Sequence, residues 1–258
     1  MMNLLKAEII KIITNKIFWI IIAVYLVSFW TTIGFIEFTI SDLEKGLPFE
    51  LANFEFPKIW GYFTFVSKYL NIIPILAIFF FITNDYSYKT MRQKVMDGSS
   101  KRDIIISNQI LIIIYGLFTT AVTASFIIYT GSKNPTSISM FDNISYLGRY
   151  FILTIGMFNM AMLFSHIFRG LLVSIIVFLG YFLLVETLFG QFLLYNGFSY
   201  SIFGVELLSL FPRNSIFNLV EFSNIAGQSV ETSIIAPALI WCIIFPIISY
   251  LTIKHKDI

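Results

Sequence analysis

Long apolar runs alternate with short polar segments along most of the chain, and this alternation predicts membrane-spanning helices. A helix needs about 20 mainly apolar residues to cross the hydrocarbon core of a bilayer. Six stretches approach that length and contain few charges, namely 17–38, 59–83, 104–130, 144–166, 170–189 and 234–253. The sequence therefore predicts an all-α, polytopic membrane protein with six transmembrane helices, built as a single transmembrane domain over residues 1–258.

Two further segments have patterns of their own. On a helix, residues 1–16 place apolar side chains on one side and Asn3, Glu8, Lys11 and neighbouring polar residues on the other. This pattern predicts an interfacial helix that lies along the inner leaflet. Residues 190–233 are apolar in part, but Gly and Pro residues interrupt them and each half is too short to span. We expect short outer re-entrant helices there, with their backbone groups satisfied by protein or water.

The composition supports a membrane location. Hydrophobic residues make up 57% of the chain and charged residues 12%, whereas about a quarter of a soluble domain is charged. The net charge of +2 is small, so we expect no nucleic-acid partner. Cys242 is the only cysteine, which excludes an intramolecular disulfide and a cysteine-based metal site and favours a small buried side chain.

The distribution of basic residues predicts the topology. If the N-terminus is cytoplasmic, eleven of the 17 Lys and Arg residues fall in cytoplasmic segments, as the positive-inside rule requires. We therefore expect both termini in the cytoplasm. The first apolar run is too long for the core of a cleavable signal peptide, so it is expected to remain as an anchor. Abundant Ile, Phe, Lys and Asn are typical of an AT-rich bacterial genome and indicate a bacterial plasma membrane.

The longest charged segment, residues 84–103, joins the second and third apolar runs. It holds five Lys or Arg residues and three Asp residues, which indicates a cytoplasmic loop. Asp85 can cap a helix over residues 86 to 96 that stops at Asp97-Gly98. A capping box from Ser100 to Asp103 then leads into the third apolar run. The loop is expected to hold one short helix between two fixed ends.

This short helix has an apolar side. Tyr88, Met91 and Val95 recur at helical spacing, while Lys89 and Gln93 lie off their face. Such a face can insert into a groove of a cytoplasmic partner. A basic loop surrounded by water or lipid headgroups is the alternative, because such loops flank most membrane helices.

Few polar residues fall within the apolar runs. Glu37 and Glu186 are the carboxylates placed there, and an intramembrane acid indicates a functional site by default. Both lie near the predicted outer ends of their helices, where snorkelling to the interface is the simpler explanation. Asn159 either bonds one helix to another or contacts a substrate. Glu186 and Asn159 are thus the candidate residues of a translocation path.

Two smaller patterns concern the contacts between helices. Gly116, Thr120 and Ala124 recur at every fourth position of the third run, and small residues at this spacing let two helices approach closely. They serve either internal packing or a subunit interface. His166 and Arg169 fall in the tight turn between the fourth and fifth runs, where contact with a headgroup or a partner is expected.

The sequence contains none of the motifs that mark membrane enzymes or nucleotide-binding subunits. It has no HExxH, no paired Asp residues in facing spans and no Asp-rich headgroup-transferase cluster. It also has no GxxxxGK[ST] phosphate loop and no duplicated half of the sort that many secondary carriers show. We therefore expect no enzyme activity, no metal site and no ATP site in this chain.

The arrangement resembles an ABC-2 type permease, the membrane subunit of a bacterial ABC exporter. The resemblance rests on the N-terminal helix beginning Met1-Met2-Asn3-Leu4-Leu5-Lys6-Ala7-Glu8, the six spans, the charged loop and the broken outer segment. The loop 84–102 follows the family pattern of an acidic residue, a Thr with a basic residue, and a small-residue turn with Arg. It departs from the pattern where Lys89 replaces a glycine, where Asp85 replaces a glutamate, and where no proline precedes Arg102.

The resemblance implies a coupling helix that docks on a separate ATPase subunit. Its residues would be Tyr88, Lys89, Met91, Arg92, Val95, Asp97, Gly98 and Arg102. ATP and Mg²⁺ would bind to that ATPase and not to this chain. One copy would form half of a translocation path, which implies a second permease, identical or sibling, in contact with membrane lipids. The alternatives are a non-pumping immunity or sensor component and a secondary carrier that uses Glu186 and Asn159.

Overall fold

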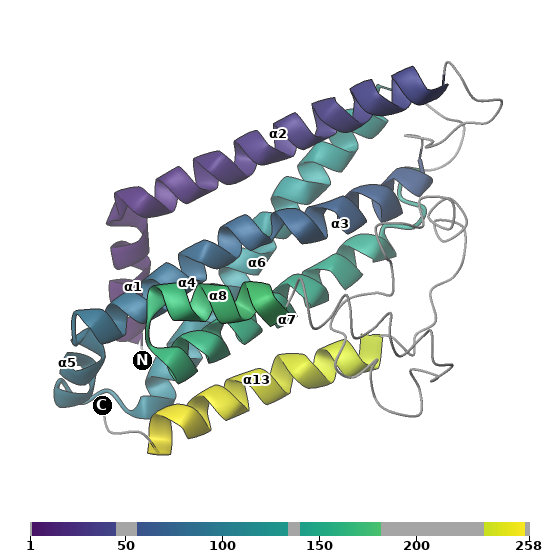
Figure 1. Ribbon diagram of the computed structural model, residues 1–258. Helices are drawn as coiled ribbons and strands as arrows, with labels where there is room; N and C mark the ends of the chain where they lie inside the picture. The colour runs from purple at the N-terminus through teal and green to yellow at the C-terminus, as the bar shows by residue number, and fades with distance from the viewer. Residues whose placement is uncertain (1, 45–55, 134–139, 182–234, 256–258) are drawn as a thin grey trace.

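The computed structural model describes residues 2–44, 56–133, 140–181 and 235–255, and every regular element in these ranges is a helix (Figure 1). The predicted re-entrant region 190–233 and Glu186 lie outside the described residues. The helices are α1 (Met2–Thr14), α2 (Lys16–Glu44), α3 (Lys58–Leu70), α4 (Ile72–Ser87), α5 (Thr90–Met96), α6 (Lys101–Gly131), α7 (Ser145–Phe168), α8 (Leu171–Gly180) and α13 (Ile235–His255).

Several of these helices can cross a membrane. Within the described ranges, three are long and apolar enough, namely Ile59–Ser87, Lys101–Gly131 and Ser145–Phe168. The first combines α3 and α4, which meet at Asn71. Lys6–Thr14 and Lys16–Thr32 form a fourth candidate if this pair, bent by 68°, is counted as one span. A multi-pass, all-helical protein is thus supported, and six spans stay a prediction.

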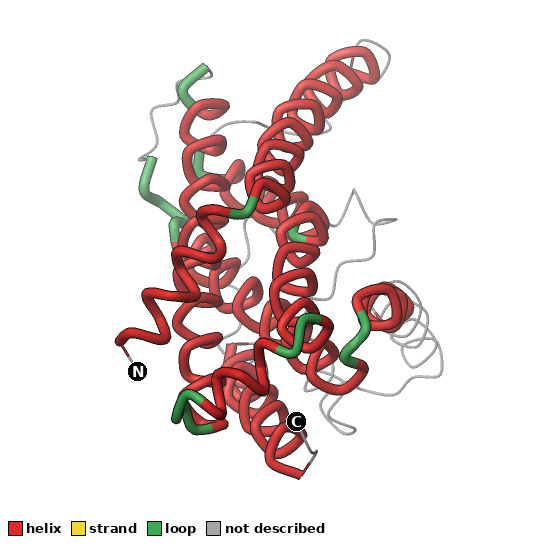
Figure 2. Tube along the Cα trace, turned by 90° about the vertical axis from the view of Figure 1, so that its left-hand side faces the viewer, coloured by secondary structure: helices red, strands yellow, loops and turns green. Residues whose placement is uncertain are grey.

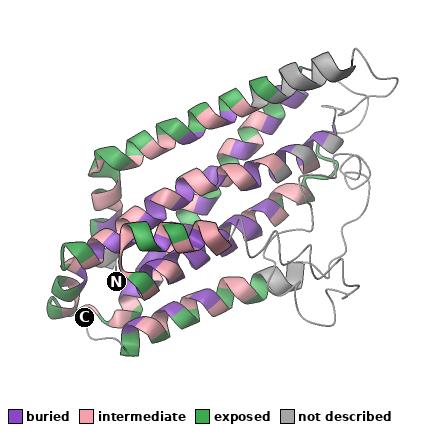
Figure 3. Ribbon diagram, viewed as in Figure 1, coloured by how far each residue is buried: buried purple, intermediate pink, exposed green. Residues whose placement is uncertain are grey.

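α7 lies at the centre of the bundle and packs against α3, α4, α6, α8 and α13. Buried residues run along most of its length, whereas α2 exposes much of its surface (Figure 3). Met157, Phe158 and Ala161 of α7 form the main hydrophobic core with Phe79 of α4 and Phe178 of α8. This burial of apolar surface positions the ends of the neighbouring helices.

Polar and small residues fix the contacts of α7 inside the bundle. Asn159 accepts a hydrogen bond from Gln109 Nε2 at 2.8 Å and donates one to the carbonyl of Cys242 at 3.2 Å, which joins α6, α7 and α13. A Cβ atom at Gly116 would lie 2.6 Å from Cδ1 of Ile155 on α7. Asn159 therefore bonds helix to helix, and Gly116 serves internal packing between α6 and α7.

The α5 end of the bundle gathers segments that are distant in the sequence. α1, α5, the α7–α8 turn and the end of α13 lie there, as Figures 1 and 2 show. Lys101 Nζ donates to the carbonyl of Ile253 at 3.1 Å, and Tyr86 Oη lies 2.8 Å from His166 Nδ1. The segments that the charge count places on one side thus meet at one end. That this end faces the cytoplasm stays a prediction.

The predicted contact of His166 with a headgroup or partner was wrong. His166 is fully buried beside Tyr86, and the Arg169 guanidinium lies 5.2 Å from the centre of the Tyr86 ring. Arg169 ends α7 in the left-handed region at φ 57. The turn therefore packs on the last part of α4 and fixes its position in the bundle.

Candidate functional site

The charged loop forms a short helix, but its start differs from the prediction. α4 continues through Asp85 and Tyr86 to Ser87, and α5 begins only at Thr90. Lys89, at the break, has φ 56 in the left-handed region. Asp85 is therefore not a helix cap. The prediction missed this because the apolar pattern of α4 ends at Thr83, although the helix runs on for another turn.

The far end of the loop agrees with the prediction. Gly98 has φ +90, a backbone conformation that glycine adopts without strain. Ser100 caps α6 in a capping box: Ser100 Oγ accepts from the Asp103 backbone N–H at 3.1 Å, and Asp103 Oδ2 accepts from the Ser100 N–H at 3.1 Å. α5 is thus joined to α6 by a short, ordered connection.

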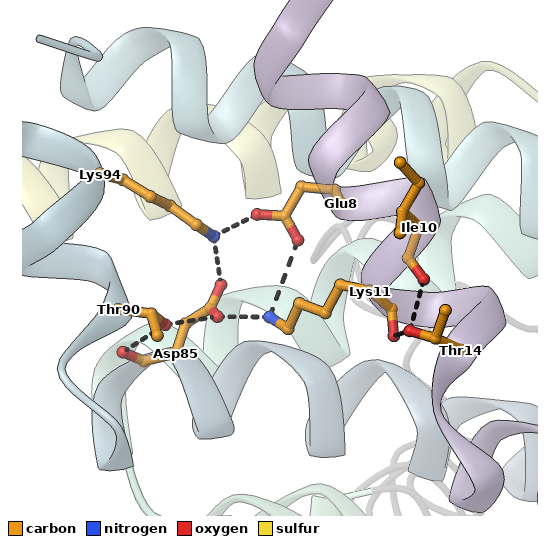
Figure 4. Close-up of polar contacts among 7 residues, drawn as sticks. All are labelled: Glu8, Ile10, Lys11, Thr14, Asp85, Thr90 and Lys94. Carbon is orange, nitrogen blue, oxygen red and sulfur yellow. Dashed lines mark hydrogen bonds and ion pairs between the residues drawn. The ribbon is translucent and has the colours of Figure 1, made fainter. Parts of the chain in front are cut away.

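A cluster of four charged side chains joins α5 to α1 and α4 (Figure 4). Lys94 Nζ of α5 lies 2.6 Å from Asp85 Oδ2 of α4 and also bonds Glu8 of α1. Lys11 of α1 bonds Asp85 and lies 3.7 Å from Glu8. Thr90 Oγ1 donates to Asp85 Oδ1 at 2.8 Å. Each cation therefore lies between two carboxylates, and the four charges cancel.

The cluster is largely shielded from solvent. The exposed fraction of the side chain is 7% for Glu8, 8% for Asp85, 16% for Lys94 and 34% for Lys11. Burial lowers the pKa of Lys94, but the carboxylates of Asp85 and Glu8 outweigh this and hold its pKa above the usual value. Lys94 is therefore charged at neutral pH. Because the loss of one partner leaves a buried charge uncompensated, such clusters are costly to break.

An apolar contact holds the other side of α5. Met91 is 2% exposed and packs with Ile104 and Ile105 of α6 and Ile253 of α13, and Val95 is partly buried against the same cluster. Tyr88, in contrast, is 76% exposed. The predicted stripe of Tyr88, Met91 and Val95 is therefore divided. Met91 and Val95 attach α5 to its own chain and do not present an apolar face to a partner.

The opposite side of α5 is open. The exposed residues that we call the α5 outer face are Tyr88, Lys89, Arg92, Gln93 and Met96. Asp97, Gly98 and Arg102 are exposed next to it. The structure thus brings six of the eight predicted coupling residues to the surface at one end of the bundle, and it buries Met91 and partly buries Val95.

Sequence reasoning missed the roles of Glu8, Lys11 and Lys94. It placed Glu8 and Lys11 on the water-facing side of the first helix, but Glu8 is buried and lies against the bundle. Ile10 and Ile13 of the same helix are 61% and 53% exposed. The opposite charges at Glu8 and Lys11 were the available signal, but the sequence does not show that they pair with a loop that begins more than seventy residues later.

The remaining predicted residues lie away from this site. The amide of Asn159 is occupied by Gln109 and Cys242, and Glu186 lies outside the described residues. Among the residues that the structure describes, no group of three or more His, Cys, Asp or Glu side chains is placed to hold a metal ion. The α5 outer face and the charge cluster behind it are therefore the candidate site.

Comparison of the chain with models of known protein families and with curated protein sequences gives no match.

Proposed function

We propose that this chain is the permease subunit of an ATP-driven exporter of the ABC-2 type, in which α5 docks on a separate ATPase. The observation that carries the proposal is the way α5 is held. Its inner side is fixed by the charge cluster and by Met91, and its outer face is open and basic. A short, firmly attached surface helix with an open face is suited to receive force from a partner.

The attachment of α5 supports a mechanical role. Lys94 and Asp85 tie it to α1 and α4, and Met91 packs it on α6 and α13. If an ATPase pair closes on binding ATP and displaces α5, the displacement passes to four helices, because no slack chain separates them from α5. Rigid-body movement of packed helices is an established means of conformational switching.

The break before α5 also agrees with the resemblance. The family pattern has a glycine where this chain has Lys89, and the backbone at Lys89 has φ 56. Glycine adopts such left-handed conformations most readily. The local geometry is thus what the family glycine would favour, although the residue differs. In this proposal the α5 end faces the bacterial cytoplasm, and a second permease completes the translocation path.

The proposal can be tested by co-purification with a candidate ABC ATPase subunit. Charge reversal on the α5 outer face, Arg92→Glu, should reduce the amount of bound ATPase by about tenfold or more, because like charges and unpaired groups penalise an interface. Lys133→Glu, an equivalent change at an exposed residue on the opposite end, is the matched control and should retain the complex. Membrane insertion should be normal in both variants.

The outcomes separate the proposal from its alternatives. Equal ATPase binding by Arg92→Glu and Lys133→Glu would contradict docking through the α5 outer face. Transport by the purified chain without an ATPase would identify a secondary carrier. Binding of a partner without coupled ATP turnover would indicate a non-pumping immunity or sensor component.

A further inference from the structure

A groove of about 500 Å³ lies beneath the elbow between α1 and α2. Its volume is within the range of about 300–1,000 Å³ that is typical of ligand sites. The walls come from α1, α2, α4 and α6 and are almost wholly apolar, with Glu8, Asp85 and Asn108 among the lining residues. Representative wall residues are Ile12, Phe18, Ile22, Ile78, Phe81 and Leu111.

The groove is open along one side. Ile13, Trp19 and Ile114 line it and are 53%, 53% and 50% exposed. A cavity enclosed by the chain would bury such residues. In a chain that spans a bilayer, an open apolar groove beside α2 meets lipid acyl chains.

A tryptophan at the bend between α1 and α2 favours a position of the groove mouth at the membrane interface. Lys6–Thr14 and Lys16–Thr32 are bent by 68° relative to each other. The bend is fixed by Asn15, whose Oδ1 accepts from the Ile17 N–H at 2.9 Å, and by Trp19, whose Nε1 donates to the Ile13 carbonyl at 2.8 Å. Tryptophan side chains are enriched at headgroup level.

The charges at the elbow indicate which kind of lipid headgroup would fit beside the groove. The charge cluster of Glu8, Lys11, Asp85 and Lys94 is neutral in itself, so it supplies no net attraction. Lys16, the first residue of α2, is exposed and has no carboxylate partner among the residues that the structure describes. Lys16 stands at the elbow, between Ile13 and Phe18, which both line the groove. A cation at this point of the chain matches a lipid with a negative headgroup.

We infer that this groove binds one acyl chain of an anionic phospholipid, with the lipid phosphate held at Lys16. The acyl chain fills the space between the elbow and the α4–α6 wall, where α1 is otherwise joined to α4 by the charge cluster. The inference does not depend on the proposed transport function, because it rests on the shape, lining and charge of the elbow region alone.

The inference is tested with the full chain purified in mild detergent and titrated with phosphatidylglycerol or phosphatidylcholine of identical acyl chains. Native mass spectrometry counts the lipids that remain bound. The wild-type chain should retain one phosphatidylglycerol, about fivefold more tightly than phosphatidylcholine, as expected for one lysine near an anionic headgroup. Lys16→Gln should remove this preference, whereas Lys133→Gln, at the opposite end, should keep it.

The acyl-chain part of the site is tested by filling the groove. Leu111→Trp places a large side chain on the groove wall and should abolish retention of both lipids. Leu117→Trp, on the same helix at a 54% exposed position outside the groove, should not change it. If Leu111→Trp does not fold, Ile12→Trp fills the groove from the α1 wall. Equal retention in groove-filled and control variants, or no preference for phosphatidylglycerol in the wild type, would overturn the inference. A dimer of this chain that forms through the groove in place of lipid, and that is lost in Leu111→Trp, would also overturn the inference.

Discussion

Asp85→Asn should release α1 from the α5 end of the bundle. Asp85 contacts Lys11, Lys94 and Thr90 together. The substitution keeps the size of the side chain but removes its charge. Glu8 is then the carboxylate partner left to both Lys94 and Lys11, and it lies 3.7 Å from Lys11. The cluster therefore carries one uncompensated positive charge.

The magnitude follows from the burial of the partners. Removing one member of a buried ion pair costs about 3–5 kcal/mol. The side chain of Lys11 is 34% exposed, and water solvates it in part, so we expect a cost near the lower limit, about 3 kcal/mol. This corresponds to an increase of roughly a hundredfold in the opening of α1.

Hydrogen–deuterium exchange of the α1 amides measures this opening directly. Asp142→Asn, at an exposed carboxylate outside the cluster, is the matched control and should leave α1 unchanged. The double variant Asp85→Asn/Lys94→Met removes the surplus cation as well, so its α1 should exchange more slowly than in Asp85→Asn alone. If Asp85→Asn changes α1 exchange by less than about threefold, the cluster does not hold α1 and the reasoning from burial is refuted.

Three further predictions concern the attachment and packing of these helices. Met91→Ala should destabilise α5 by about 2–5 kcal/mol through the loss of buried contacts, seen as faster amide exchange over residues 90–96. Gly116→Ala should lower the free energy of unfolding by about 1 kcal/mol, because its Cβ would crowd the Ile155 methyl group; Gly148→Ala, with open space around it, should not. The pKa of Lys94 is raised in the folded state. The stability that its ion pairs contribute is therefore fully present below the pKa of an unfolded lysine, about 10.4, and is lost as pH rises through the folded pKa. Protection of α1, corrected for intrinsic exchange, should thus be constant near neutral pH and, on the alkaline side, fall at strongly alkaline pH.

The parts of the fold that depend on local sequence could be predicted. The capping box at Ser100, the turn at Gly98 and the helical N-terminal segment are each determined by residues a few positions apart. The apolar runs predicted helices of membrane-spanning length for the same reason. These features need no knowledge of which segments meet in space.

The parts that depend on contacts between distant segments could not be predicted. The apolar residue Met91 is compatible with a partner groove or with its own bundle, and only the positions of Ile104 and Ile253 decide between them. Glu8 belongs to the polar side of an amphipathic helix, but its side chain packs on Lys94 and is shielded from water. A charge pattern in one segment does not identify the segment that neutralises it.

The central proposal is that the α5 outer face contacts an ATPase in the cytoplasm. Met96 is 73% exposed on this face, and a single cysteine can be placed there as Met96→Cys in a Cys242→Ser background. In membrane vesicles that also contain the candidate ATPase, a short thiol cross-linker should join this cysteine to the ATPase, whereas Met91→Cys, buried in the same helix, should give no product. Labelling of Met96→Cys from the outer side of the membrane, or equal cross-linking from both positions, would contradict the account.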